Sequence, residues 1–219
     1  MESSEVSSLE KHLEGWQQEV ASLFPHRKIK TLVIDITGKS VCVTRFVKPL
    51  PSPEVIENEK TTPEMAARFV SMIPSIAGST FFPGLFDIWL TSDVRSRSFF
   101  CLTFEKSKVK RAIFLQQILR LLTGDSEDHA LLLCSYFLHL GLKAYVLLGS
   151  GIPHGSTAYV FVKEGFSKNS EYYIWDPTNG QKYNINDSFC PLQKIYCLID
   201  DQNVSFGIEK NLNKANSFL

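Results

Sequence analysis

The amino-acid sequence predicts an α+β domain in which a buried central helix packs on an antiparallel sheet. Helical patterns occupy the first part of the chain, and five segments with strand character follow one another after Gly141. Helices followed by a meander of strands are typical of this fold class. The 219 residues, of which 44% are hydrophobic, suffice for one large domain with a packed core.

The N-terminal segment, residues 1–26, has the pattern of an amphipathic helix. Its apolar residues recur at steps of three and four positions and therefore share one face: Leu9, Leu13, Trp16, Val20 and Leu23. The helix either docks on the domain or forms the tail of a coiled coil that begins upstream in a longer protein. Its few heptads favour docking.

The main domain is expected over residues 27–210, and residues 211–219 form a C-terminal tail. It opens with a predicted β-hairpin, "IKTLVIDITGKSVCVTRFV", in which apolar and polar residues alternate on both sides of a turn at Gly38. A helix then begins at "TTPEMAARFVSMI", with Thr62 as its N-cap and Pro63 in its first turn. Another helix is expected over "KVKRAIFLQQILRLLTG".

The central helix is predicted from "GDSEDHALLLCSYFLHLG". Asp125 is its expected N-cap, Asp128 completes a variant capping box, and Gly141 stops the helix at the C′ position. Asp125, Glu127 and Asp128 each complement the helix dipole by about 0.3–1 kcal/mol, so these acids need no catalytic role. Ser126 falls near the first helical position, and a broad apolar face follows it, as in a helix buried at a domain centre.

The five strand candidates after this helix are short and rich in aromatic and β-branched residues. Asn179-Gly180 is a strong hairpin-turn signal between two of them. The strand candidates are "KAYVLLG", "TAYVFVK", "EYYIWDP", "QKIYCLI" and "VSFGIEK".

Composition and charge exclude several classes of function. The 23 basic and 23 acidic residues cancel, which argues against nucleic acid as a partner. The sequence contains neither an apolar run long enough for a transmembrane segment nor the apolar core of a signal peptide. The five cysteines are scattered without a C-x-x-C, so we expect no disulfide framework, no metal site and no cofactor in a reduced, cytoplasmic protein.

Several motifs together resemble a known family. The helix start "GDSEDHA", the strand "TAYVFV" and the strand ending "WDP" resemble the transglutaminase-like branch of the papain-like cysteine-peptidase fold. With "AARFVSMIP", "YYIWDPTNGQKY" and "FCPLQKIYCLI", they are similar to the C-terminal region of the coiled-coil and C2 domain-containing protein 2 family, and best to its B paralogue. A related domain occurs in the centrosomal protein of 76 kDa. The resemblance runs from about Arg27 to Lys210, and the stretch at about 91–110 departs from it like an insertion.

The resemblance implies a catalytic triad that has lost two of its three members. In active relatives a cysteine at the helix start is the nucleophile, a histidine on the second element is the base, and an aspartate on the third orients it. Ser126 stands at the nucleophile position, Thr157 at the base position and Asp176 at the orienting position. Because threonine cannot accept a proton near neutral pH, the resemblance implies a pseudoenzyme.

Two histidines offer an alternative base. His154 lies three residues before Thr157 in a loop, and His129 lies three residues after Ser126 on the same helix. A hydrolase or acyltransferase using Ser126, one of these histidines and Asp176 is therefore the alternative function. Asp176 is also explained as the start of a turn, "WDPTNG".

A third possibility is a peptide-binding module that keeps a degenerate substrate cleft. Five aromatic residues are candidates for its lining: Tyr159, Tyr172, Tyr173, Trp175 and Tyr183. The preferred expectation is a non-catalytic scaffold for protein–protein interaction. The resemblance places that role in the cytoskeleton at the ciliary transition zone, in cilium biogenesis, with other transition zone proteins as partners. The sequence does not fix an oligomeric state.

Overall fold

The computed structural model describes residues 11, 12, 14, 15, 18, 19, 22, 32–34, 40–51, 61–75, 123–165 and 171–206. Those from 11 to 22 are helical and exposed. The apolar positions of the predicted N-terminal helix, the stretch at about 91–110, residues 108–122 of the helix expected at 108–124 and the C-terminal tail lie outside the described residues. The division into three segments therefore stays a prediction.

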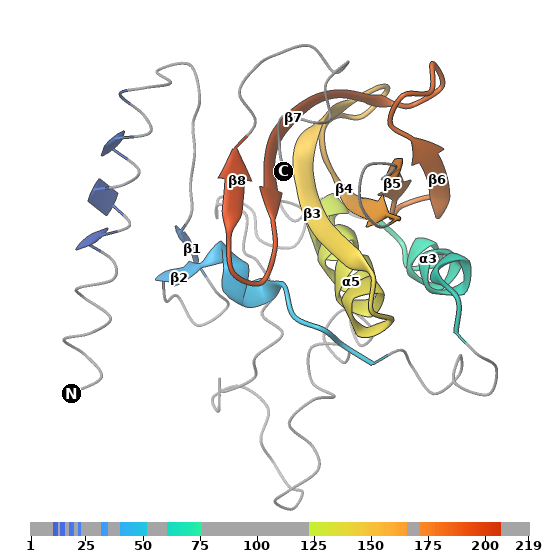
Figure 1. Ribbon diagram of the computed structural model, residues 1–219, viewed down its shortest axis with the longest axis horizontal. Helices are drawn as coiled ribbons and strands as arrows, with labels where there is room; N and C mark the ends of the chain where they lie inside the picture. Colours follow the sequence, from blue (N-terminus) through green and yellow to red (C-terminus); the bar gives the residue numbers. More distant parts are fainter. Residues whose placement is uncertain are drawn as a thin grey trace, which may run out of the picture.

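The core of the molecule is one helix, α5 (Ser126–His139), packed on a six-stranded antiparallel sheet (Figure 1). The sheet order is β6-β5-β4-β3-β7-β8. Its strands are β3 (Lys143–Gly151), β4 (Gly155–Glu164), β5 (Glu171–Asp176), β6 (Gln181–Asn184), β7 (Leu192–Ile199) and β8 (Val204–Phe206). This arrangement confirms the predicted α+β fold with a central helix.

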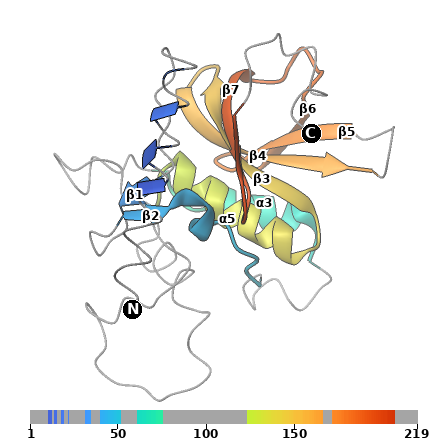
Figure 2. The ribbon, with the colours of Figure 1, turned by 60° about the vertical axis from the view of Figure 1, so that its left-hand side comes forward.

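α5 lies across β3 and β4 on one face of the sheet (Figure 2). Its residues from Asp128 to Phe137 are all buried, as expected for a helix at a domain centre. It ends in a Schellman motif: the Gly141 N–H donates to the Leu138 carbonyl oxygen at 3.1 Å, and the Leu142 N–H to that of Phe137 at 3.0 Å. Gly141 has a φ of 81°, which only glycine adopts without strain, so the predicted stop at this residue is confirmed.

The second helix, α3 (Pro63–Ser71), packs against α5. The Thr62 hydroxyl accepts a hydrogen bond from the Met65 N–H at 3.3 Å, and Pro63 is the first helical residue. Both predictions for this helix start are confirmed. The ring of Phe69 meets that of Tyr136 on α5 edge-to-face, with centroids 6.4 Å apart.

The N-terminal hairpin is shorter than predicted. β1 (Leu32–Ile34) pairs antiparallel with β2 (Ser40–Cys42), but the chain then turns into a 3₁₀ helix, η1 (Val43–Phe46). The alternating pattern suggested a strand through this segment, and that extension was wrong. Burial explains the change. In a strand, Val43 and Phe46 would point to opposite faces, so only one of them could be buried. The 3₁₀ turn places both side chains in the core cluster that contains α5.

The two faces of the sheet carry different apolar clusters. Ala158, Val160 and Trp175 belong to the core that contains α5, and we call this side of the sheet the helix face. Tyr159 and Ile174 alternate with them and belong to a second cluster on the outer face. The outer cluster also contains Leu147, Phe161, Ile185, Leu192 and Leu198.

Candidate functional site

The start of α5 is the place where the resemblance puts a nucleophile, and a reciprocal pair of hydrogen bonds caps it. The Asp125 carboxylate accepts from the Asp128 N–H at 2.9 Å, and the Asp128 carboxylate accepts from the Asp125 N–H at 3.5 Å. This reciprocal pair is the predicted capping box. The acids next to Ser126 therefore serve the end of the helix.

Ser126 is the first residue of α5 and is half-buried. Its hydroxyl donates to a carboxylate oxygen of Glu127 at 2.7 Å. A serine needs a neighbouring base that takes its proton as it attacks, and imidazole does this near neutral pH. The hydroxyl proton of Ser126 instead points to a carboxylate on the same helical turn.

His129 lies one turn after Ser126 but is held elsewhere. The side chain is completely buried, with Nδ1 2.6 Å from the Asp125 carbonyl oxygen and Nε2 2.9 Å from the Ile73 carbonyl oxygen. Both ring nitrogens therefore face backbone acceptors, and neither is directed at the Ser126 hydroxyl. Sequence spacing placed His129 near Ser126, but it could not show that the end of α3 would supply a competing acceptor.

The second candidate base, His154, lies in the turn between β3 and β4 and is exposed. No hydrogen bond joins it to Ser126, Thr157 or Asp176, all of which are among the described residues. The structure thus brings neither histidine into contact with the serine.

Thr157 and Asp176 lie on neighbouring strands, β4 and β5. β4 pairs with β3 and with β5 in a regular register, so successive side chains alternate between the two faces of the sheet. Thr157 therefore shares the outer face with Tyr159, and Asp176 shares it with Ile174. Ser126, by contrast, begins the helix that packs on the helix face.

The Asp176 carboxylate is occupied by the turn that follows β5. It accepts from the Thr178 N–H at 3.0 Å, the Thr178 hydroxyl at 2.7 Å and the Asn179 side-chain amide at 3.0 Å. The Gly180 N–H closes the turn on the Asp176 carbonyl oxygen at 2.8 Å. The sequence signal "DPTNG" predicted a turn, but Asn179-Gly180 is not a two-residue hairpin: Asp176 pairs with Gln181 across four residues, and β6 follows as a strand absent from the predicted set.

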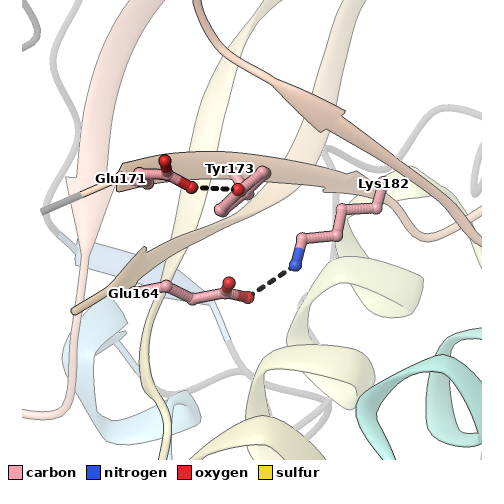
Figure 3. Close-up of polar contacts among 4 residues, drawn as sticks. All are labelled: Glu164, Glu171, Tyr173 and Lys182. Carbon is pink, nitrogen blue, oxygen red and sulfur yellow. Dashed lines mark hydrogen bonds and ion pairs between the residues drawn. The ribbon is translucent and has the colours of Figure 1, made fainter.

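The aromatic residues predicted to line a cleft are divided between the two faces. Tyr159, Tyr172 and Tyr183 pack in the outer cluster, whereas Trp175 meets Phe137 of α5 edge-to-face at 5.2 Å. Tyr173 lies beneath Lys182, whose ammonium is 3.9 Å from the ring centroid and 2.7 Å from the Glu164 carboxylate. Figure 3 shows this contact and the hydrogen bond that the Tyr173 hydroxyl donates to Glu171. The five residues therefore do not gather around one groove.

The cysteine thiols nearest the core are unsuited to nucleophilic chemistry. Burial, with the charges of Asp200 and Asp201, raises the pKa of Cys134 far above its usual value. Burial also raises the pKa of Cys197 to about 12. Because the thiolate is the reactive form, both side chains act as core residues.

Comparison with known proteins gives the same relatives as the motifs. The family described as the CEP76 peptidase-like domain matches residues 113–217. Protein CC2D2B of Homo sapiens is 36% identical over 195 residues, which is 87% of this chain and 12% of that protein. This chain is related to the coiled-coil and C2 domain-containing protein 2 family.

Two further relatives extend the comparison. Coiled-coil and C2 domain-containing protein 2A of Drosophila melanogaster is 28% identical over 94% of this chain and 14% of its own length. The centrosomal protein of 76 kDa of Homo sapiens is 29% identical over 85% of this chain and 26% of its own length. The chain thus carries the peptidase-like domain of this group and spans a minor part of each relative. The higher identity to the CC2D2B protein agrees with the predicted B paralogue.

No described helix is long and apolar enough to cross a membrane. Within the same residues, no group of three or more His, Cys, Asp or Glu side chains is arranged to hold a metal ion.

Proposed function

We propose that this chain is a non-catalytic, transglutaminase-like scaffold domain that acts in protein–protein interaction at the base of the cilium. The observation that carries the proposal is the set of partners at the three triad positions. Ser126 donates to Glu127, Thr157 offers no base, and the Asp176 carboxylate is used by its own turn. A domain that keeps the fold without these groups is suited to binding.

The relatives support the cellular setting of the proposal. One of them is named as a centrosomal protein. The motif resemblance implies the ciliary transition zone, with other transition zone proteins as partners. We extend this setting to the chain as a proposal, because the chain spans only 12% and 14% of the two CC2D2 relatives.

A hydrolase or acyltransferase that uses Ser126 stays the competing prediction. It requires an imidazole nitrogen within about 3 Å of the Ser126 hydroxyl. The two carbonyl contacts of His129 and the exposed position of His154 argue against it. A peptide-binding module finds less support, since the five aromatic residues do not share one face.

The test is amide hydrolysis and acyl transfer by the purified chain, measured with glutamine-containing peptides and acyl esters. The Ser126→Ala variant is compared with the wild type to test the nucleophile. The His154→Ala and His129→Gln variants are compared with it to test the two candidate bases. We expect every protein to give only the background rate. Turnover that disappears in Ser126→Ala and in one histidine variant would establish the hydrolase instead.

The scaffold role has its own test in ciliated cells. We expect the fluorescently tagged chain to collect at the base of the cilium, and Ser126→Ala to collect equally well because the serine has no catalytic task. A uniform distribution of the folded chain would contradict the proposed setting for this domain alone.

A further inference from the structure

Two neighbouring loop tips each present one large apolar side chain to solvent. Ile152, in the turn between β3 and β4, is 64% exposed, and Phe189, between β6 and β7, is 83% exposed. The loops adjoin, because the Ile152 N–H donates to the Pro191 carbonyl oxygen at 2.9 Å. Single exposed apolar residues are common on protein surfaces, but here two stand on loops that are joined by a hydrogen bond. We call Ile152 and Phe189 the tip pair.

The loop that carries Phe189 is built to hold it outward. The Phe189 N–H donates to the Asp187 carboxylate at 3.1 Å, and the Cys190 N–H donates to the Asp187 carbonyl oxygen at 3.1 Å. The Asn186 N–H donates to the side-chain oxygen of Asn184 at 3.0 Å. Successive turns of this kind fix the backbone locally. Phe189 is therefore presented by a hydrogen-bonded loop, and Asp187 is engaged with the backbone beside it.

We propose that the tip pair inserts into the lipid–water interface of a membrane. A specific protein interface buries about 800 Å² on each partner around a packed centre, and the exposed neighbours Gly155, Ser156 and Ser188 do not extend the patch toward such an area. Insertion of two apolar tips into lipid requires no matching surface. This contact goes beyond the proposed scaffold role and does not depend on it.

The charges around the tip pair are compatible with anionic lipid. Lys194 is exposed and lies opposite Ser150 in the pairing of β7 with β3, two residues from Ile152. We expect its ammonium to reach a lipid phosphate when the tips are inserted. The carboxylate of Asp187 is the nearby opposing charge, and it already accepts the Phe189 N–H. We therefore expect binding to strengthen moderately as anionic lipid is added and to weaken with salt.

Removing either apolar side chain should weaken vesicle binding about ten- to a hundredfold, the change that corresponds to withdrawing one large side chain from an apolar phase. The experiment is flotation of the purified chain with vesicles of phosphatidylcholine, with and without phosphatidylserine. We expect the wild type to float with the vesicles, and the Ile152→Ser and Phe189→Ser variants to stay in the bottom fraction of the gradient. Met72→Ser is the matched control, because Met72 is an exposed apolar residue on α3, 74% exposed, outside the patch.

A second measurement reports the depth of position 189 directly. Brominated phosphatidylcholine should quench the added fluorescence of the Phe189→Trp variant, and should leave that of Met72→Trp unchanged. All these positions are exposed, so the variants should fold, and urea unfolding verifies this. The proposal is overturned if the wild type does not float, if the tip variants float as well as Met72→Ser, or if both tryptophan variants are quenched equally. None of these outcomes bears on the catalytic assays above.

Discussion

The Nε2 atom of His129 lies 2.9 Å from the carbonyl oxygen of Ile73, a residue 56 positions earlier in the chain. The contact ties the first turns of α5 to the end of α3. Nearby, the Gly124 N–H donates to the Pro74 carbonyl oxygen at 3.3 Å, and the Thr123 hydroxyl donates to the same oxygen at 3.1 Å. The region that resembles a catalytic helix start is thus a structural junction between two helices.

Replacing His129 by leucine should lower the free energy of unfolding. The Ile73 carbonyl oxygen would lose its imidazole partner, and a buried unsatisfied group costs about 1–3 kcal/mol. The Asp125 carbonyl oxygen would keep its hydrogen bond from the backbone N–H of residue 129. Urea unfolding followed by circular dichroism measures the change. The exposed His154→Leu variant is the control and should stay within about 0.5 kcal/mol of the wild type. Equal midpoints for both variants would show that the junction contributes nothing.

Asp176→Ala should destabilise the chain by about 2–3 kcal/mol, because hydrogen bonds to a charged acceptor are stronger than neutral ones. The lost acceptor serves Thr178 and Asn179 in the turn after β5. Asp176→Asn keeps one side-chain oxygen and should lose less. Asp201→Ala, at an exposed position in the turn after β7, is the comparison for removing a carboxylate alone. If Asp176→Ala and Asp201→Ala unfold at the same urea concentration, the turn does not depend on this carboxylate.

Gly149→Ala should cost about 1–3 kcal/mol through overpacking. A Cβ atom at this position would lie 2.3 Å from the Lys194 carbonyl oxygen of β7, and a backbone atom in a paired strand cannot move aside easily. Thermal unfolding compares this variant with Ser150→Ala, which makes no new contact of that kind. An unchanged melting temperature for Gly149→Ala would mean that β7 relaxes freely at its register shift.

Stability should fall at alkaline pH because buried groups keep their protons. Burial, with the charge of Asp176 nearby, raises the pKa of Tyr159 from 10.0 to about 12, and burial raises that of Cys197 from 9.0 to about 12. Between about pH 9 and 12 the unfolded chain releases these protons while the folded chain retains them, so the free energy of unfolding decreases as pH rises. Below about pH 8 the two groups contribute almost no slope, because they are protonated in both states.

Urea unfolding at pH 8 and pH 10.5 measures this loss. The Cys197→Ala variant should show a smaller difference between the two pH values than the wild type, although it is less stable at both. A wild-type stability that stays constant over this interval would contradict the raised pKa values.

Much of the fold could be read from local patterns. The capping box at Asp125 and Asp128, the proline start of α3 and the glycine end of α5 are all set by residues within a few positions of one another. Such short-range signals can be read from the sequence because the residues that form each cap lie within one helical turn of one another. Aromatic and β-branched runs predicted the strands β3, β4, β5, β7 and β8, but the short β6 was missed.

The sequence by itself determined the capped central helix, most of the sheet and the absence of cysteine and histidine at the aligned positions Ser126 and Thr157. Only the tertiary structure decided where the remaining polar groups point. The ring of His129 turns to Ile73 because α3 ends beside it, and the carboxylate of Asp176 turns to Thr178 because the chain reverses there. The segment after Cys42 became a 3₁₀ turn for a similar reason: burial of Val43 and Phe46 in the core cluster that contains α5 outweighed a local alternation typical of a strand.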